Sequence, residues 1–277
     1  MRALRDVLSP VLAGLAGVAT IFILAIIIGH LASAGGAHLS IAYLTTSPTR
    51  AGLQGGIASV LINTVAILGV TLAVVVPVGT LAGVLLFERT RNAPRLTRAV
   101  RRSLDVLAGV PSIVFGLFGM KLFCAVLGLG WSILAGGLTL ACMALPFLVR
   151  ATEEGLRGVD AEQPLACAAL GTSRVGALWH VLVPAAAPSI VAGIVLGIGR
   201  ALAETAAVRF TAGAAMRMPE SLLDPGRALA YHVYMLAIEV PGGGSRAASA
   251  ALVLVVLVSL TTVLANAAAR TFIGRSA

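Results

Sequence analysis

Long apolar stretches alternate with short polar ones along this chain. A helix needs about 20 apolar residues to cross a hydrocarbon layer about 30 Å thick. Six stretches meet this requirement, and we expect transmembrane helices at 7–31, 57–87, 104–129, 132–149, 188–210 and 247–269. The pattern therefore predicts an all-α integral membrane protein with six transmembrane helices. A further apolar stretch at 230–240 is about half as long as a span, which favours an interfacial or re-entrant helix.

Several spans contain helix-breaking or small residues. Pro77 lies inside the second span, and Gly109 and Pro111 break the third near its start. In a bundle, neighbouring helices can satisfy the backbone groups that such residues free. The fourth span carries small residues that allow helices to approach closely, namely Ala135, Gly136, Gly137 and Ala141.

The composition agrees with the bilayer as solvent. The 277 residues are 58% hydrophobic and only 11% charged, whereas soluble domains average about 25% charged residues. The net charge of +9 could indicate nucleic-acid binding, but the arginines gather in short loops beside apolar spans, with few aromatic residues among them to stack on bases. This placement follows the positive-inside rule and argues against nucleic acid as a partner.

The arginine distribution orients the spans. The loop 88–103 carries six arginines, which marks it as cytoplasmic. The layout places thirteen arginines inside: Arg2, Arg5, Arg89, Arg91, Arg95, Arg98, Arg101, Arg102, Arg150, Arg157, Arg174, Arg270 and Arg275. Four lie outside, namely Arg50, Arg217, Arg227 and Arg246, and Lys121, Arg200 and Arg209 lie within spans. This asymmetry predicts that both termini are cytoplasmic.

The same layout divides the chain. Residues 1–56 form a first transmembrane helix and an extracytoplasmic loop, and 57–277 form a core of five transmembrane helices with a long cytoplasmic loop at 150–187. The triplet at 32–34, Ala-Ser-Ala, resembles a signal-peptidase site, so cleavage is an alternative. The apolar run before it is about 25 residues, longer than the 7–15 of a signal peptide, which favours a retained span.

Two charged residues in the fifth span suggest a solute path. Arg200 and Glu204 are four residues apart, so a continuous helix would place them on one face about 6 Å apart. Charged groups inside a bilayer are costly and face a bundle interior, a partner or a polar path. The pair is either a stabilising salt bridge or a gate for an anion, since the planar fork of arginine suits tetrahedral oxyanions. For Arg209 and Lys121, extension to the head-group level is the simpler interpretation.

The loop 150–187 predicts a contact with a partner. Pro164 suits the first turn of a helix, which we expect to continue through Gly171 towards His180. The chain has no GxxxxGK[ST] phosphate-binding loop, so energy for transport would have to come from another subunit. The alternative is an ordinary cytoplasmic loop.

Residues for catalysis or metal binding form no recognisable pattern. Cys124, Cys142 and Cys167 lack metal or redox spacing, and the four histidines, His30, His38, His180 and His232, are scattered. No serine stands in a GxSxG setting. We therefore expect no catalytic residue, no metal ligand and no cofactor in this chain.

Three regions resemble the PstA-type permease of bacterial phosphate ABC importers, members of the binding-protein-dependent transport inner-membrane components. They are GVPSIVFGLF at 109–118, LPFLVRATEEGLRGV at 145–159 leading into ALGTSRVGALWHVLVPAAAPSI at 169–190, and GIGRALAETAAV at 197–208. The glycine, nine residues and hydrophobic-x-hydrophobic-Pro of the loop are typical of ABC-importer permeases in general. The first and third stretches together point to the phosphate branch.

The resemblance implies a type I ABC-importer permease with a cytoplasmic coupling helix, in a bacterial plasma (inner) membrane. It implies three kinds of partner besides lipid: a second, PstC-like permease, two PstB-like ATPase subunits that bind ATP and Mg, and an extracytoplasmic PstS-like phosphate-binding protein. It assigns the substrate path to Arg200, Glu204 and Thr205. It assigns ATPase coupling within the 165–184 helix and its start to Glu162, Leu165, Ala166, Ala169, Leu170, Gly171, Thr172 and Pro184.

Some positions depart from the family pattern and keep other cargoes open. The loop has Leu165, Ala166 and Cys167 where the family usually has Glu-Ala-Ala. Ala203 stands for a usual glycine, Ala207 for a proline and Arg209 for an apolar residue. A permease for sulfate or molybdate is therefore an alternative. A secondary transporter is another, although it predicts an internal repeat and carboxylates in several spans, and a membrane scaffold or enzyme is a third.

Overall fold

The structure is a computed structural model that describes residues 2–273, with side chains described for residues 12–89, 93 and 95–267. Part of the expected charge asymmetry rests on Arg2, Arg5, Arg91, Arg270 and Arg275, whose side chains lie outside the described ones.

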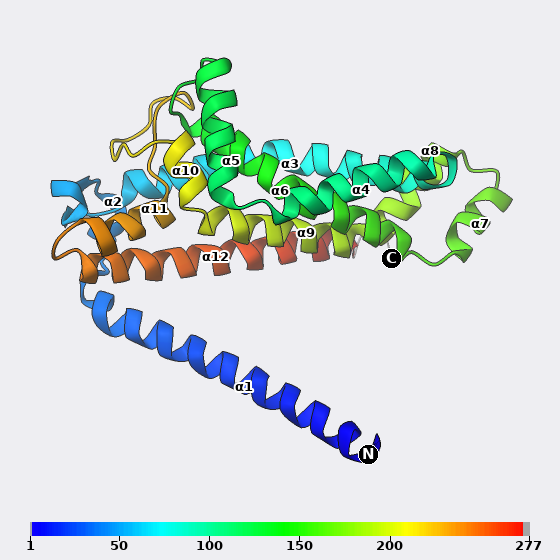
Figure 1. Cartoon of the computed structure of the whole chain (residues 1–277), viewed down its shortest axis with the longest axis horizontal. Helices are drawn as coiled ribbons and strands as arrows, with labels where there is room; N and C mark the ends of the chain where they lie inside the picture. Colours follow the sequence, from blue (N-terminus) through cyan, green and yellow to red (C-terminus); the bar gives the residue numbers. More distant parts are fainter. Residues whose placement is uncertain (1, 274–277) are drawn as a thin grey trace.

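Four long helices run nearly parallel and form the body of the molecule (Figure 1). They are α3 (Ala58–Asn92), α6 (Ile133–Arg157), α9 (Val183–Ala203) and α12 (Gly244–Ile273). With α1 (Arg2–Gly35), five helices in the described part are long and apolar enough to cross a membrane. A bent pair of helices gives a sixth crossing if it is counted as one span. The prediction of an all-α, multi-span fold is confirmed.

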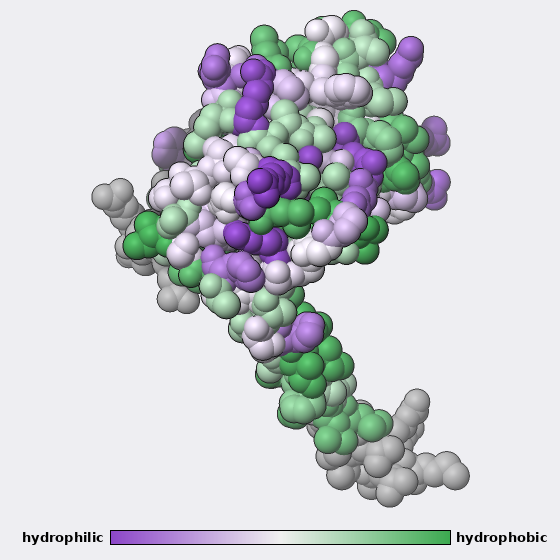
Figure 2. Space-filling model, turned by 90° about the vertical axis from the view of Figure 1, so that its left-hand side faces the viewer, coloured by the Kyte–Doolittle hydropathy of each residue, from purple (hydrophilic) through white to green (hydrophobic). Residues whose placement is uncertain are grey.

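Helix α1 diverges from the bundle along most of its length (Figure 1). It touches α12 where Gly35 lies against Ser249, whose hydroxyl donates to the Gly35 carbonyl at 2.8 Å. A Cβ at position 35 would lie 2.4 Å from the Ser249 nitrogen, so the contact requires glycine. From residue 12 on, α1 exposes apolar side chains such as Ile21 and Phe22, and Figure 2 shows a hydrophobic surface along this helix. This surface suits lipid or another membrane helix.

Helices α3 and α6 pack closely through glycines. A Cβ at Gly83 of α3 would lie 2.5 Å from the Cβ of Thr152, and one at Gly137 of α6 would lie 2.5 Å from the Cβ of Val70. Gly136 meets Ala212 on the opposite side of α6. The prediction that small residues of the fourth span permit close approach is confirmed. Helix α3 also continues through Pro77.

The third predicted span is not one helix. Residues 104–109 belong to α4 (Pro94–Gly109), and the chain then turns by 100° into α5 (Ser112–Gly119) and the π-helical η3 (Met120–Val126). Pro111 explains the turn, because it lacks an N–H and forces the preceding Val110 into an extended conformation, with ψ 130°. The prediction of a span over 104–129 is therefore wrong in its first six residues. Helix α4 lies along α6, and α5 projects from the bundle (Figure 1).

Short elements close the end of the bundle opposite α7 and α8 (Figure 1). They are η1 (Gly36–His38), α2 (Ile41–Thr45), β1 (Pro48–Thr49), η2 (Arg50–Gly52), β2 (Gln54–Gly55), α11 (Leu229–Tyr234) and η5 (Met235–Glu239). Strands β1 and β2 are antiparallel and pair Pro48 with Gly55. The apolar stretch at 230–240 is thus a short helix, as predicted, and it buries Leu229, Tyr231 and Leu236 within the protein.

Candidate functional site

Arg200 occupies the last turn of α9 and faces α6. Its guanidinium carbon lies 4.9 Å from the centre of the Phe147 ring, a cation–π contact. The Nε atom of Arg200 is buried and has no hydrogen-bond partner. Among the residues that the structure describes, no carboxylate oxygen lies within 4.0 Å of this guanidinium. Arg200 is therefore a cation held by an aromatic ring, with hydrogen-bonding capacity left unused.

The helix that should carry both Arg200 and Glu204 breaks between them. Helix α9 ends at Ala203, Glu204 is extended with ψ 130°, and a new helix α10 (Ala206–Thr211) begins after Thr205. The predicted span over 188–210 is therefore wrong at its outer end, and so is the expected i, i+4 pair. The alternative of a stabilising Arg200–Glu204 salt bridge is not realised. Instead, the Glu204 carboxylate lies beside the Ser112 hydroxyl, with the Arg200 charge near enough to act on it electrostatically.

The break brings together two sequence stretches that are far apart in the chain. Ser112 is the first residue of α5, and α5 packs on α10 at Gly116, where a Cβ would lie 2.9 Å from the Cα of Ala207. Glycine is thus required at 116 for α5 to approach α10 this closely. A serine hydroxyl, a carboxylate and a guanidinium therefore meet where α5, α9 and α10 join. Such groups can hold and release an oxyanion.

Arg209, one turn further on, has a partner within the protein. It donates to the Glu239 carboxylate at 3.1 Å and lies 5.5 Å from the centre of the Tyr231 ring. Extension to the lipid head groups is therefore not needed to explain this residue. Lys121 lies exposed on η3.

The loop at 150–187 contains two short helices in place of the one predicted. Helix α7 (Glu162–Ala169) ends in a Schellman motif, in which the Thr172 N–H donates to the Cys167 carbonyl at 3.0 Å and Gly171 adopts a φ of 69°. Ser173 then caps α8 (Arg174–Ala177), which passes through the π-helical η4 (Leu178–Leu182) into α9. The expected continuation through Gly171 is wrong, because a left-handed glycine ends a helix.

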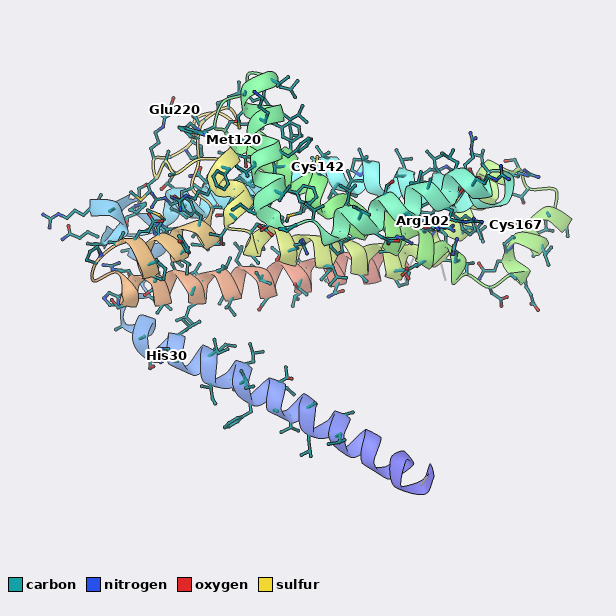
Figure 3. All side chains as sticks on the ribbon, viewed as in Figure 1. His30, Arg102, Met120, Cys142, Cys167 and Glu220 are labelled. Atoms are coloured by element: carbon teal, nitrogen blue, oxygen red, sulfur yellow. The ribbon has the colours of Figure 1, made fainter. Side chains whose placement is uncertain are left out.

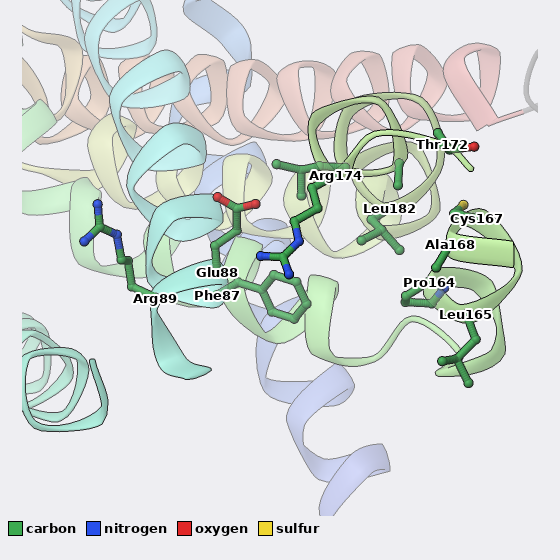
Figure 4. Close-up of a pocket in the computed structure, with 12 residues that line it drawn as sticks. Phe87, Glu88, Arg89, Pro164, Leu165, Cys167, Ala168, Thr172, Arg174 and Leu182 are labelled. Carbon is green, nitrogen blue, oxygen red and sulfur yellow. The ribbon is translucent and has the colours of Figure 1, made fainter. Parts of the chain in front are cut away.

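The predicted docking residues lie on the surface of this loop. Leu165 is 70% exposed and Leu170 83% exposed, which is unusual for leucine. Beside them a cavity of about 670 Å³ opens between the loop and the end of α3. Figure 4 shows Pro164 and Leu165 on one side of it, and Phe87 and Arg174 on the other. Glu162, Ala166, Ala169 and Thr172 are also exposed, and Pro184 lies in the first turn of α9.

Glu153 is a polar contact that sequence reasoning missed. It lies on α6 and is 1% exposed, yet it accepts hydrogen bonds from Arg101 of α4 and forms an ion pair with Arg157. Its position four residues before Arg157, near the end of an apolar span, was the available signal.

The three cysteines are free, and Cys142 and Cys167 lie far apart along the bundle (Figure 3). Within the described residues, no group of three or more His, Cys, Asp or Glu side chains could hold a metal ion.

Comparison with known proteins decides the family. Residues 75–274 match the binding-protein-dependent transport system inner membrane component. The chain belongs to this family. A probable ABC transporter permease, YqgI of Bacillus subtilis, is 33% identical over 83% of this chain and 83% of its own length. The phosphate transport system permease protein PstA 1 of Mycobacterium tuberculosis H37Rv is 40% identical over 57% of this chain, but the match spans only 51% of that protein.

A solved structure shares the fold. A chain of the MetNI methionine ABC transporter, in an inward-facing conformation, superposes with a TM-score of 0.62 at 20% sequence identity. The match covers 77% of this chain and 96% of that one. The residues it leaves out amount to about a quarter of this chain, and the family match likewise begins only within α3. The ABC-importer permease fold is thus confirmed, and this chain is a membrane component of a transport system.

Proposed function

We propose that this chain is a permease subunit of an ATP-driven phosphate importer. The observation that carries the proposal is Arg200, a cation with an unused buried Nε and no carboxylate bound to it in the described part of the chain. An arginine in this state can accept an oxyanion without first breaking an ion pair. Relatives that are named as phosphate permeases support phosphate as the cargo.

The path in this proposal begins where α5, α9 and α10 meet. Glu204, beside Ser112, also lies near Arg200 and limits how strongly an anion is retained, because a negative charge nearby opposes a second one. Thr205 adds a hydroxyl at the same break. Binding must be strong enough for entry and weak enough for release. Arg200, Glu204 and Thr205 together meet both needs.

In this proposal, a pair of ATPase subunits that bind ATP and Mg docks on α7 and supplies the energy for transport. The exposed Leu165 and Leu170 support a partner there, since leucines this exposed in a cytoplasmic loop mark an interaction surface. A second permease and an extracytoplasmic phosphate-binding protein complete the transporter. We further propose that it resides in a bacterial plasma membrane, with both termini in the cytoplasm and no covalent chemistry in this chain.

Phosphate uptake in a host that lacks its own phosphate importers tests the cargo. The chain, expressed with the neighbouring genes for its partners, is expected to restore uptake of labelled phosphate, and excess sulfate or molybdate should not compete. Absence of rescue, or competition by sulfate or molybdate, would overturn phosphate as the cargo.

A variant of the docking loop tests the ATPase contact. Gly171→Asp places a charged side chain at the exposed end of α7, where the space around the glycine is open and the left-handed backbone strains aspartate less than most side chains. The fold should survive, but the ATPase should no longer co-purify or drive uptake. Gly242→Asp, at an equally open glycine with a φ of 78° at the other end of the molecule, is the control for this strain. Unchanged co-purification and uptake in Gly171→Asp would contradict docking at α7.

A further inference from the structure

Glu153 gathers two arginines at one carboxylate oxygen. Its Oε1 atom accepts from the Arg101 Nε at 2.8 Å and from a second nitrogen of the same guanidinium, and the Arg157 Nη2 lies 3.1 Å away. We call these three residues the Glu153 cluster. The carboxylate is 1% exposed, so its lost hydration is offset chiefly by these contacts.

The cluster attaches α4 to the bundle, together with Arg150 of α6, which contacts Asp105 and the Arg101 carbonyl. Among the α4 side chains that the structure describes, Thr97 alone is buried, while Leu96 and Val106 are 60% and 69% exposed. Helix α4 therefore has little apolar packing to hold it in place. The polar contacts with α6 have to fix its position.

The cluster also lies between the docking loop and the solute path. Arg157 is the last residue of α6, and five residues later the docking helix α7 begins. At its other end, α4 leads through Pro111 to Ser112, which contacts Glu204 beside Arg200. If the docking loop displaces α6, helix α4 can therefore transmit this displacement to the solute path.

We propose that Glu153 is a positioning residue that ties α4 to α6, so that movement of the docking loop is transmitted to Ser112 and Glu204. This inference rests on the proposed function. Breaking the cluster should let the docking loop move without shifting α4. The partner ATPases would then hydrolyse ATP with little solute transport.

The chain offers a matched control. Arg150 of α6 pairs with Asp105 of α4, so it joins the same two helices by the same chemistry, but Asp105 is 65% exposed. An exposed pair contributes little to position because water competes for both partners. Asp105→Asn therefore removes one carboxylate charge between α4 and α6 without disturbing a buried group.

The first measurement uses the assembled complex in liposomes, with phosphate uptake and ATP hydrolysis recorded together. Glu153→Gln keeps the shape of the side chain and removes its charge. The ratio of phosphate transported to ATP hydrolysed should fall about tenfold, a size typical of coupling between sites, while hydrolysis itself continues. Asp105→Asn should leave the ratio unchanged. Equal ratios in wild type and Glu153→Gln, or an equal fall in both variants, would overturn the inference.

The second measurement does not depend on the cargo. Spin labels on Leu107 of α4 and Leu196 of α9, both exposed, report the distance between these helices with and without nucleotide. Wild type and Asp105→Asn should show a nucleotide-dependent change that Glu153→Gln lacks, whereas a persisting change in Glu153→Gln would refute the role of the cluster. If phosphate uptake fails in wild type but the labels respond, the proposed cargo is wrong and the inference stands.

A third variant covers the case in which Glu153→Gln does not assemble. Arg101→Lys keeps the positive charge and loses the two-nitrogen contact with Glu153. It should lower the transport ratio and the label response in the same direction. Wild-type values for both would overturn the inference.

Discussion

Helix α6 holds two arginine contacts of opposite kinds, six residues apart. At Glu153 it binds Arg101 and Arg157 through a buried carboxylate, and at Phe147 it holds Arg200 by an aromatic ring alone. The first contact leaves its carboxylate with two cationic partners. The second leaves a buried Nε without a partner. One arrangement is suited to fixing a helix, and the other to receiving a ligand.

The difference follows from what an incoming anion would have to displace. At Glu153 it would compete with a buried carboxylate already bound to two guanidiniums, and removing one partner of a buried ion pair is costly. At Arg200 it would displace no such group. The two sites therefore differ in the partners of their arginines and not in the charge of those arginines.

Replacing Arg200 should have the largest effect. We expect Arg200→Ala to reduce phosphate uptake to background while the ATPase still co-purifies, because the path loses its cation and the docking loop is untouched. Uptake of labelled phosphate and co-purification measure the two effects. Arg102→Ala, at an exposed arginine of α4, is the control and should transport normally. Normal uptake in Arg200→Ala would refute the path.

Removing the whole Glu153 side chain should also lower the stability of the protein. Glu153→Ala leaves Arg101 without its buried partner, and we expect a loss of about 3–5 kcal/mol in the free energy of unfolding. Asp105→Ala should cost at most about 1 kcal/mol, since that pair is exposed. Denaturation of the detergent-solubilised protein compares the two. Similar losses in both variants would show that burial does not separate these ion pairs.

A third arginine, Arg227, tests whether every buried arginine that binds no carboxylate belongs to a functional site. Arg227, 6% exposed, lies 3.5 Å from the Nδ1 of His232, outside the membrane-spanning helices. Burial, and then the Arg227 charge, lower the pKa of His232 from 6.5 to about 4. The folded protein thus favours neutral histidine.

The pH dependence of stability follows from this shift. Because the folded-state pKa lies below the ordinary one, the contribution of His232 is complete above pH 6.5 and is lost as the pH falls towards 4. We expect a loss approaching about 3 kcal/mol over this range. Thermal unfolding between pH 4 and 8 measures it, and His232→Gln should lack this part of the pH dependence. An identical pH profile in wild type and variant would contradict a buried neutral histidine.

Removing the Phe147 ring, which contacts Arg200, should have the smallest effect. Phe147→Leu removes the cation–π contact but keeps an apolar side chain, so we expect a loss of about 1 kcal/mol in the positioning of Arg200. Uptake at low phosphate should fall about fivefold. Phe147→Tyr keeps the ring and should behave like wild type. If phosphate uptake is the same in Phe147→Leu as in wild type, the ring does not hold the guanidinium in place.

Much of the fold could be predicted from residue patterns, because long apolar stretches have no stable alternative to a membrane-spanning helix. The predicted spans at 57–87, 132–149 and 247–269 correspond to α3, α6 and α12. The predictions failed at local breaks. Gly171 ended α7, and Glu204 separated α9 from α10. The break at Gly109 and Pro111 was predicted, but its angle of 100° was not. Hydrophobicity does not record such breaks.

The sequence by itself determined the class of protein, the main helices and Arg200 as a charged residue inside an apolar span. Only the tertiary structure decided which charges have partners. Ser112 lies beside Glu204, and Arg101 reaches Glu153, because α4 lies along α6 and α5 packs against α10, across separations of about 50 to 90 residues. Hydrophobic burial depends on the local run of residues, but the pairing of buried charges depends on which helices meet.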